Sequence, residues 1–144
     1  MREILFRGKR TDNGKWIEGS LVVAGDYCCI LPADENSVHP TEYPYLNSET
    51  GTIDGHLIPV DPSTVGQYVS GLIDKNGKKI FEGDIILRRY VRPYFLVEYS
   101  EEDTEYQANF FDGSCASLYK YFSSKESKVI GNIHDNPELL EDKP

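Results

Sequence analysis

Two segments of this chain, 8–22 and 71–86, repeat the same pattern of residues. Each carries an Asn-Gly pair, at 13–14 in the first and at 76–77 in the second, followed by a lysine, an isoleucine and then Glu-Gly. Such a pair between apolar residues is a strong hairpin signal, because a type I′ turn requires positive φ at both central residues. The sequence therefore predicts two small β units that each begin with a type I′ hairpin.

The length of 144 residues fits one domain or two small units. Two separate halves would each bury too little apolar surface to be stable alone, so we expect them to pack together or the protein to form a homo-oligomer. The chain has 10 Tyr and 12 Gly but one Met, which favours strands and turns over helices. No apolar run is long enough for a membrane span or a secretory signal, so we expect no membrane partner.

The cysteines and histidines are not spaced as metal ligands. Cys28 and Cys29 are adjacent and Cys115 is far away, which fits neither a disulfide framework nor a zinc site. We expect Cys28 and Cys29 to be small apolar strand residues. The sequence thus predicts no cofactor, no metal and a cytoplasmic location.

The charge is uneven along the chain. A formal net charge of −9 disfavours nucleic acid as a partner, because neutralising phosphates supplies most of the non-specific affinity. Most cationic residues nevertheless lie near the two hairpins, whereas acidic residues dominate elsewhere, above all in 98–105. This distribution favours solubility and cationic partners.

In the first half, apolar alternation predicts strands at 3–7, 16–23, 27–31 and 55–60. The polar segment 32–55 is long for a structureless connection, and such segments are usually functional or mobile loops. Asp61-Pro62-Ser63-Thr64 resembles the start of a helix or a turn, so the boundary between the units is placed at Pro62.

In the second half, strands are predicted at 79–81, 85–91, 94–100, 105–111 and 129–133. A helical turn at 118–122 before the last strand gives the pattern of an SH3-like five-stranded barrel. Asn136 as N-cap and Pro137 at the first helical position predict a short C-terminal helix. The expected fold is mainly β, with a β unit at 1–62, the barrel at 63–134 and a helical turn and tail at 135–144.

One segment, 88–95, mixes arginines with aromatic rings, the chemistry that binds phosphates and stacks on bases. Strand alternation places Arg88, Tyr90 and Arg92 on one face. The candidate binding surface consists of Arg88, Tyr90, Arg92, Tyr94, Lys78 and Lys79. We favour the alternative that the arginines pair with carboxylates of the returning strand. Three carboxylates are available there, Glu98, Glu101 and Glu102.

Three other positions have a functional and a structural interpretation. The loop at 74–77 has the residue types of a calcium loop, but its glycine comes too early for an EF-hand. Asp84 could belong to a pair of carboxylates, or could accept backbone N–H groups in a turn. Trp16 could anchor an interface or belong to a hairpin core. We favour the structural interpretation in each case.

The segments that carry a family resemblance are REILFRGK (2–9) with Trp16, TVGQ (64–67), GLIDKNGKKIFEGDI (71–85) and VIGNIHDNPELL (129–140). They resemble the YopX family at both ends and in the middle of the chain. The resemblance implies a mostly β protein of temperate phages and prophages of Gram-positive bacteria, with a C-terminal SH3-type barrel and no established activity. It supplies no catalytic residue.

Three classes of function are compatible with these observations. The first is a phage accessory protein that binds a host or phage protein without catalysis, and this is the function we expect. The second is a nucleic-acid-associated protein that uses the basic hairpins and whose binding weakens steeply with salt. The third is an enzyme, which needs convergent titratable groups in a pocket. We expect no catalytic residues and no enzymatic activity.

Overall fold

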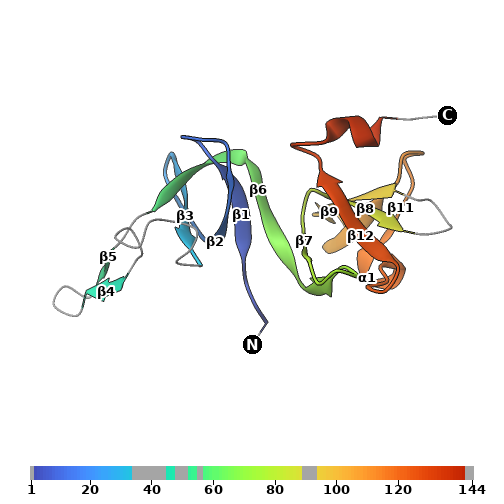
Figure 1. Ribbon diagram of the computed structural model, residues 1–144, viewed down its shortest axis with the longest axis horizontal. Helices are drawn as coiled ribbons and strands as arrows, with labels where there is room; N and C mark the ends of the chain where they lie inside the picture. Colours follow the sequence, from blue (N-terminus) through green and yellow to red (C-terminus); the bar gives the residue numbers. More distant parts are fainter. Residues whose placement is uncertain (1, 34–44, 48–51, 55–56, 89–93, 142–144) are drawn as a thin grey trace. The chain divides into compact units, whose positions relative to one another are not determined.

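A computed structural model describes residues 2–33, 45–47, 52–54, 57–88 and 94–141 (Figure 1). Its strands are β1 (Phe6–Arg10), β2 (Trp16–Ala24), β3 (Tyr27–Pro32), β4 (Tyr45–Asn47), β5 (Thr52–Asp54), β6 (Ile58–Ile73), β7 (Lys79–Phe81), β8 (Asp84–Arg88), β9 (Tyr94–Ser100), β10 (Glu105–Asn109), β11 (Cys115–Ser117) and β12 (Ser127–Asn132). Helix α1 (Leu118–Tyr121) and the 3₁₀ turn η3 (Pro137–Leu140) complete the described elements. The expected mainly β class is confirmed.

The chain forms two compact units. The N-terminal unit is Ile4–Gln67, and the C-terminal unit combines Met1–Glu3 with Tyr68–Pro144. Strand β6 runs from the first unit into the second. Among the described helices, none has the length and apolar character needed to cross a membrane.

In the N-terminal unit, four antiparallel strands form a closed ring of ladders. β1 pairs with β2, β2 with β3, β3 with β6, and β6 again with β1. The side chains of Ile17, Ile30, Ile58 and Val60 fill its core. A separate two-stranded ladder joins β4 to β5. The closed ring leaves β1 and β6 side by side, although they are far apart in the sequence (Figure 1).

The interpretation of residues 61–64 as a helix or turn start is wrong, because they lie within β6. Opposite β1 the register jumps, with Arg7 paired to Gly66 but Lys9 paired to Asp61. The backbone N–H of Ser63 donates to Asp61 Oδ1 at 3.0 Å, and Thr64 Oγ1 accepts the N–H of Lys9 at 2.9 Å. The side-chain bonds that often start a helix stabilise a bulge here.

Strands β2 and β3 approach each other very closely at Gly19. A Cβ atom at this position would lie 2.0 Å from the carbonyl oxygen of Leu31 and 2.9 Å from the backbone nitrogen of Ala33. The N–H of Ala33 also donates to the carbonyl of Glu18 at 3.1 Å. Backbone atoms therefore occupy the space that any larger residue would need.

The two Asn-Gly turns form where the sequence predicts them, but not as type I′ turns. Gly14 and Gly77 have φ of 71° and 81°, whereas neither Asn13 nor Asn76 has a positive φ. The Asn13 side chain instead accepts the N–H of Lys15 through Oδ1 at 2.9 Å. In these longer loops a type I-like segment precedes one left-handed residue, so only the glycine needs positive φ.

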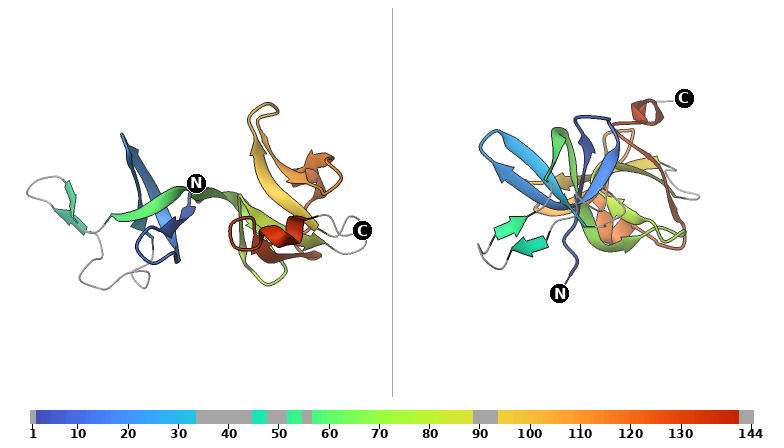
Figure 2. Two further views of the ribbon diagram at one scale, coloured as in Figure 1. Left: turned by 90° about the horizontal axis from the view of Figure 1, so that it is seen from above. Right: turned by 60° about the vertical axis from the view of Figure 1, so that its left-hand side comes forward.

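The C-terminal unit contains a five-stranded antiparallel sheet in the order β11-β10-β9-β8-β12. Figure 2 shows β9 and β10 as its long yellow-to-orange hairpin. The segment 79–81, expected as a barrel strand, pairs with β6 instead, and β11 belongs to the sheet. No ladder joins β11 to β12 among the described residues, so a closed barrel is not shown.

Aromatic rings dominate the core of the C-terminal unit. The ring of Phe95, which is fully buried, packs edge to face on Phe110 and Tyr121 with centroids 6.1 and 5.3 Å away. Ile86 and Val97 of the neighbouring strands β8 and β9 belong to the same cluster. Helix α1 lies against β10 and β11, and its Tyr121 completes the aromatic contacts.

A buried carboxylate attaches the second Asn-Gly turn to this sheet. Asp74, only 2% exposed, accepts the N–H groups of Asn76 and Lys78 through Oδ1 at 2.8 and 2.9 Å. Its Oδ2 accepts the N–H of Val129 in β12 at 3.0 Å. Asp84 is a turn aspartate as expected, and its Oδ2 accepts the N–H of Phe81 at 2.8 Å. Both carboxylates therefore have structural roles.

The short helical elements lie close to where they are predicted. Helix α1 spans Leu118–Tyr121, and the C-terminal turn η3 is of the 3₁₀ type. The expected N-cap bond of Asn136 is absent from η3. Asn136 Oδ1 accepts the N–H of Asn132 at 3.2 Å instead, so this side chain closes the preceding turn.

Candidate functional site

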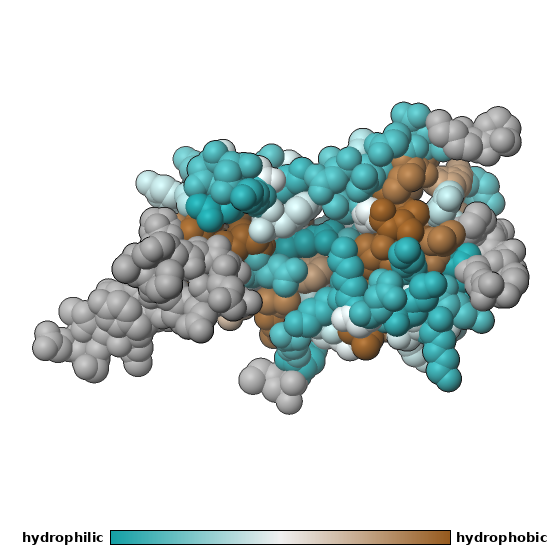
Figure 3. Space-filling model, viewed as in Figure 1, coloured by the Kyte–Doolittle hydropathy of each residue, from teal (hydrophilic) through white to brown (hydrophobic). Residues whose placement is uncertain are grey.

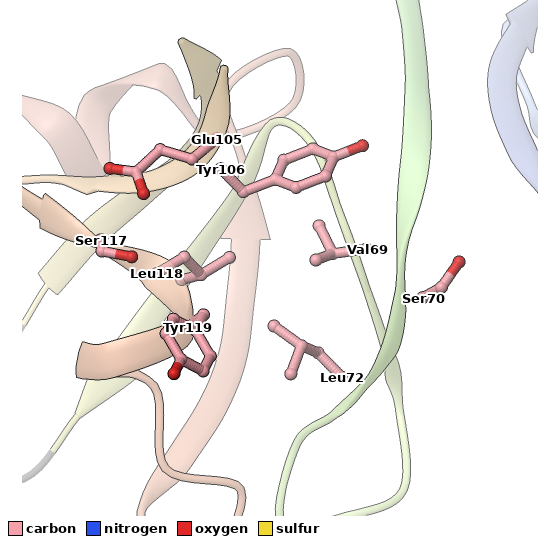
Figure 4. Close-up of a pocket in the computed structure, with 8 residues that line it drawn as sticks. All are labelled: Val69, Ser70, Leu72, Glu105, Tyr106, Ser117, Leu118 and Tyr119. Carbon is pink, nitrogen blue, oxygen red and sulfur yellow. The ribbon is translucent and has the colours of Figure 1, made fainter. Parts of the chain in front are cut away.

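The C-terminal unit has a cavity of about 380 Å³ between β6 on one side and β10, β11 and α1 on the other. Its lining residues are Val69, Ser70, Leu72, Glu105, Tyr106, Ser117, Leu118 and Tyr119 (Figure 4). This volume lies in the range of pockets that bind small ligands or individual side chains of a partner.

Four apolar side chains form the interior of the cavity. Figure 4 shows Val69 and Leu72 pointing from β6 toward Leu118 of α1 and the ring of Tyr106 in β10. Val69 and Leu118 are buried and belong to the aromatic core cluster, and Leu72 and Tyr106 pack against it. The interior of the cavity is therefore continuous with the packed core of the unit.

An irregularity in β6 places two of these side chains on one side. In a regular strand Val69 and Leu72 would face opposite sides, because side chains alternate. Gly71 has a φ of 91°, and the register between β6 and β7 shifts between Tyr68 and Ile73. Gly71 thus breaks the alternation and allows both side chains to face the cavity.

One stretch of β10 beside the cavity lacks a neighbouring strand on this side. β11 pairs with β10 only from Gln107 to Asn109, because the chain turns into α1 after Ser117. Glu105 and Tyr106 pair with β9 on the other side and have no second ladder partner among the described residues. Helix α1 follows Ser117 directly and lies against β10 here, so the chain itself occupies the position beside Tyr106.

One tyrosine and one carboxylate lie at the rim of the cavity. Tyr119 is 82% exposed, and Glu105 lies at the edge formed by β10. Burial raises the pKa of Tyr106, and the nearby charge of Glu82 adds to this increase. Tyr106 is therefore a neutral phenol at physiological pH, with an apolar ring toward the cavity. On the face shown in Figure 3, hydrophobic residues (brown) also reach the surface of the C-terminal unit.

Arg88, from the surface predicted by sequence, packs against the segment around α1. Its guanidinium lies 4.5 Å from the ring centroid of Tyr121 and 3.4 Å from the carboxylate of Glu126, and it also donates to the carbonyl of Tyr121. The prediction that Arg88 pairs with a carboxylate of the returning strand is therefore wrong, because its carboxylate partner is Glu126. Glu98 of that strand accepts a bond from Asn109 instead.

The other members of that surface have separate surroundings. Lys79 lies 3.2 Å from the Glu3 carboxylate, and its ammonium lies 5.6 Å from the ring centroid of Tyr68. Lys78 is exposed, and Tyr94 packs edge to face on Phe111 with centroids 5.8 Å apart. Tyr90 and Arg92 lie outside the described residues, as does most of the polar segment 32–55.

Trp16 is half-buried at the start of β2. The guanidinium of Arg7 lies 4.8 Å from its ring centroid, and the ammonium of Lys9 lies 5.5 Å away. It packs against cations and is not a member of the apolar core cluster of the N-terminal unit. The described residues contain no group of three or more His, Cys, Asp or Glu side chains placed to hold a metal ion.

The family model of the YopX protein matches residues 5–141. The chain belongs to the YopX family. The match includes the closed ring of strands and all eight residues that line the cavity of this YopX chain. No curated protein matches it.

Sequence reasoning missed the cavity of this YopX chain. Its lining comes from β6, β10, β11 and α1, and no local pattern shows which of their faces meet. One signal was available: Gly71 and Leu72 lie in a segment that resembles the family, and a glycine within an apolar strand indicates a bulge or a close approach.

Proposed function

We propose that this YopX-family chain is a non-catalytic protein-binding module, encoded by a phage or prophage and active in the bacterial cytoplasm. In this proposal the cavity receives an apolar side chain from a segment of a host or phage protein. The observation that carries the proposal is an apolar cavity with the exposed ring of Tyr119 at its rim.

The cavity and its aromatic rim match the physics of peptide recognition. A partner segment that inserts one apolar side chain into a pocket shields that side chain fully from water, and such buried anchors supply most of the binding energy of an interface. Exposed tyrosines such as Tyr119 supply a large contact area with few rotatable bonds. A bound segment would shield the apolar side chains of the cavity from water.

A nucleic-acid partner has less support, because three of the cations near the hairpins already have carboxylate partners. Arg10 lies 2.7 Å from Asp12, and Lys79 and Arg88 lie 3.2 and 3.4 Å from Glu3 and Glu126. Phosphate binding would compete with these ion pairs in a chain of net charge −9.

The test compares two adjacent tryptophan substitutions. Leu72→Trp fills the cavity, whereas Ile73→Trp adds the same ring at a neighbouring position that is 43% exposed. We expect one stoichiometric protein from a lysogenic host lysate to be retained by the wild type and by Ile73→Trp. Leu72→Trp should lower its recovery by about tenfold or more, because a blocked pocket removes a central anchor. Recovery is measured by quantitative mass spectrometry.

A second variant guards against misfolding of Leu72→Trp. Tyr119→Ser changes a side chain that is 82% exposed, so the fold should be unaffected, and we expect recovery of the partner to fall about fivefold. Equal recovery by wild type, Leu72→Trp and Tyr119→Ser would contradict the proposal. Recovery of nucleic acid alone, lost at moderate salt, would favour the alternative function.

A further inference from the structure

We propose that the side chain that enters this cavity is a tryptophan of the partner protein, with its six-membered ring inside and its indole N–H at the rim. This inference rests on the proposed function and specifies the residue that the partner contributes. It follows from the size of the cavity, from the rings that line it and from the place of its carboxylate.

The cavity is larger than a small apolar side chain needs. A cavity of about 150 Å³ is enough to hold a benzene ring, and this cavity has a volume of about 380 Å³. A leucine or phenylalanine side chain would leave part of the space empty, and lining atoms beside a void lose their van der Waals contacts. The volume therefore favours the indole ring of tryptophan, which is the largest apolar side chain.

The walls of the cavity combine aliphatic side chains with aromatic rings. Val69 and Leu72 of β6 point toward Leu118 of α1 and the ring of Tyr106 (Figure 4). The ring of Tyr119, which is 82% exposed, stands at the rim. Contacts between aromatic rings stabilise a complex beyond the burial of their area, so the two tyrosines favour an aromatic ligand over an aliphatic one.

Glu105 supplies a hydrogen-bond acceptor at the edge of the cavity. Its carboxylate points away from Val69 and Leu72 (Figure 4). The hydroxyl of Ser117 also belongs to the lining, and it forms no capping bond with α1 although Ser117 precedes this helix. Because a carboxylate accepts hydrogen bonds and does not donate them, a polar group of the ligand beside Glu105 should be a donor.

The N–H group of tryptophan lies at the matching end of the side chain. It belongs to the five-membered ring, which is attached to the backbone, so it stays near the rim when the six-membered ring enters. A tyrosine would instead carry its hydroxyl at the far end of the ring and place it among Val69, Leu72 and Leu118. Burying a hydroxyl in apolar surroundings without a partner is unfavourable, so the cavity selects against tyrosine.

Four synthetic peptides test this inference. Each is a pentapeptide blocked at both ends, with glycine at the four outer positions and tryptophan, N-methylated tryptophan (methylated on the indole nitrogen), leucine or tyrosine at the centre. Binding to the full-length chain, labelled with nitrogen-15, is followed by NMR. We expect the tryptophan peptide to shift the amide signals of Leu72, Tyr106 and Leu118. It should bind about tenfold more tightly than the leucine and tyrosine peptides.

The methylated peptide and a variant of Glu105 examine the role of the N–H group. The methylated peptide lacks this donor and should bind about threefold more weakly than the tryptophan peptide. Glu105→Ala should weaken the tryptophan peptide by a similar factor and leave the methylated peptide unchanged, because both changes remove the same hydrogen bond. Glu138→Ala is the matched control, since Glu138 is exposed in η3, and it should bind all four peptides as the wild type does.

The outcomes separate the two proposals. Equal or tighter binding of the leucine peptide, with shifts at the cavity, would overturn the preference for tryptophan while supporting an apolar anchor in the cavity. If none of the four peptides shifts the signals of the cavity residues, the proposed function fails with the inference. Unchanged affinity of Glu105→Ala for the tryptophan peptide would overturn the place given to the N–H group.

Discussion

Replacing Gly19 with alanine should unfold the N-terminal unit at much lower denaturant concentrations than the wild type requires. The new Cβ would lie 2.0 Å from the carbonyl oxygen of Leu31, and the backbone of β3 would have to move to accept it. β3 is joined to β6 as well as to β2, so its displacement would strain the whole ring. We expect a loss of about 3 to 5 kcal/mol in the free energy of unfolding.

Trp16 makes this prediction measurable, because it is the one tryptophan of the chain and starts β2. Its fluorescence during urea denaturation reports on the N-terminal unit. Ser20→Ala, at the exposed neighbouring position, is the matched control and should change the free energy by less than about 0.5 kcal/mol. If Gly19→Ala unfolded at the same urea concentration as Ser20→Ala, this would contradict the claim that the β3 backbone leaves no space for a Cβ atom at Gly19.

Replacing Asp74 with alanine should produce a comparable loss in the C-terminal unit. The substitution leaves the N–H groups of Asn76, Lys78 and Val129 without their carboxylate acceptor. Each hydrogen bond to a buried charged group contributes about 1.5 to 3 kcal/mol, and water can reach part of the exposed turn, so we expect a total loss of about 3 to 5 kcal/mol.

The control for Asp74 is a second aspartate with a similar local bond. Asp112 Oδ1 accepts the N–H of Ser114 at 2.9 Å, but in an exposed turn. Asp112→Ala should therefore cost about 1 kcal/mol or less. Hydrogen exchange measured by mass spectrometry should show lost protection in β12 for Asp74→Ala and not for Asp112→Ala. Equal protection in both variants would contradict the role of Asp74.

The contribution of Asp74 should also depend on pH. Burial by itself would raise the pKa of this carboxyl group, but the N–H bonds from Val129, Lys78 and Asn76 outweigh it and lower the pKa below 3.8. A lowered pKa in the folded state means that the stabilisation is complete above the unfolded value and is lost as the pH falls through the folded value. The stability difference between the wild type and Asp74→Asn should therefore be constant near neutral pH and shrink below about pH 4.

The sequence predicted the positions of the turns better than their geometry. Gly14 and Gly77 must adopt positive φ in either turn type, so the Asn-Gly signal locates both turns. The type depends on whether the side chains around them bond to the backbone, as Asn13 does with Lys15 and Asp74 does with Lys78. Those bonds form only in the folded loop, and the dipeptide alone does not reveal them.

Residues 61–64 show the same limit in another way. The sequence Asp-Pro-Ser-Thr favours both a helix start and a bulge. In both structures, side-chain oxygens of Asp, Ser or Thr accept backbone N–H groups. The ladder between β6 and β1 decides in favour of the bulge. The candidate site was less predictable still, since the convergence of Val69, Tyr106 and Leu118 depends on tertiary packing between distant segments.

The composition of the C-terminal unit has a consequence for the order of folding. Glu3 accepts a bond from Ser70 Oγ and pairs with Lys79, yet the entire N-terminal unit separates it from them in the chain. The β1–β6 ladder, which pairs Phe6 with Gln67, brings these distant ends together. The N-terminal ring of strands therefore closes this long loop when it forms, and the entropic cost of closure falls on that step. The C-terminal unit can then assemble around Glu3 and Ser70, which the ring already holds close together.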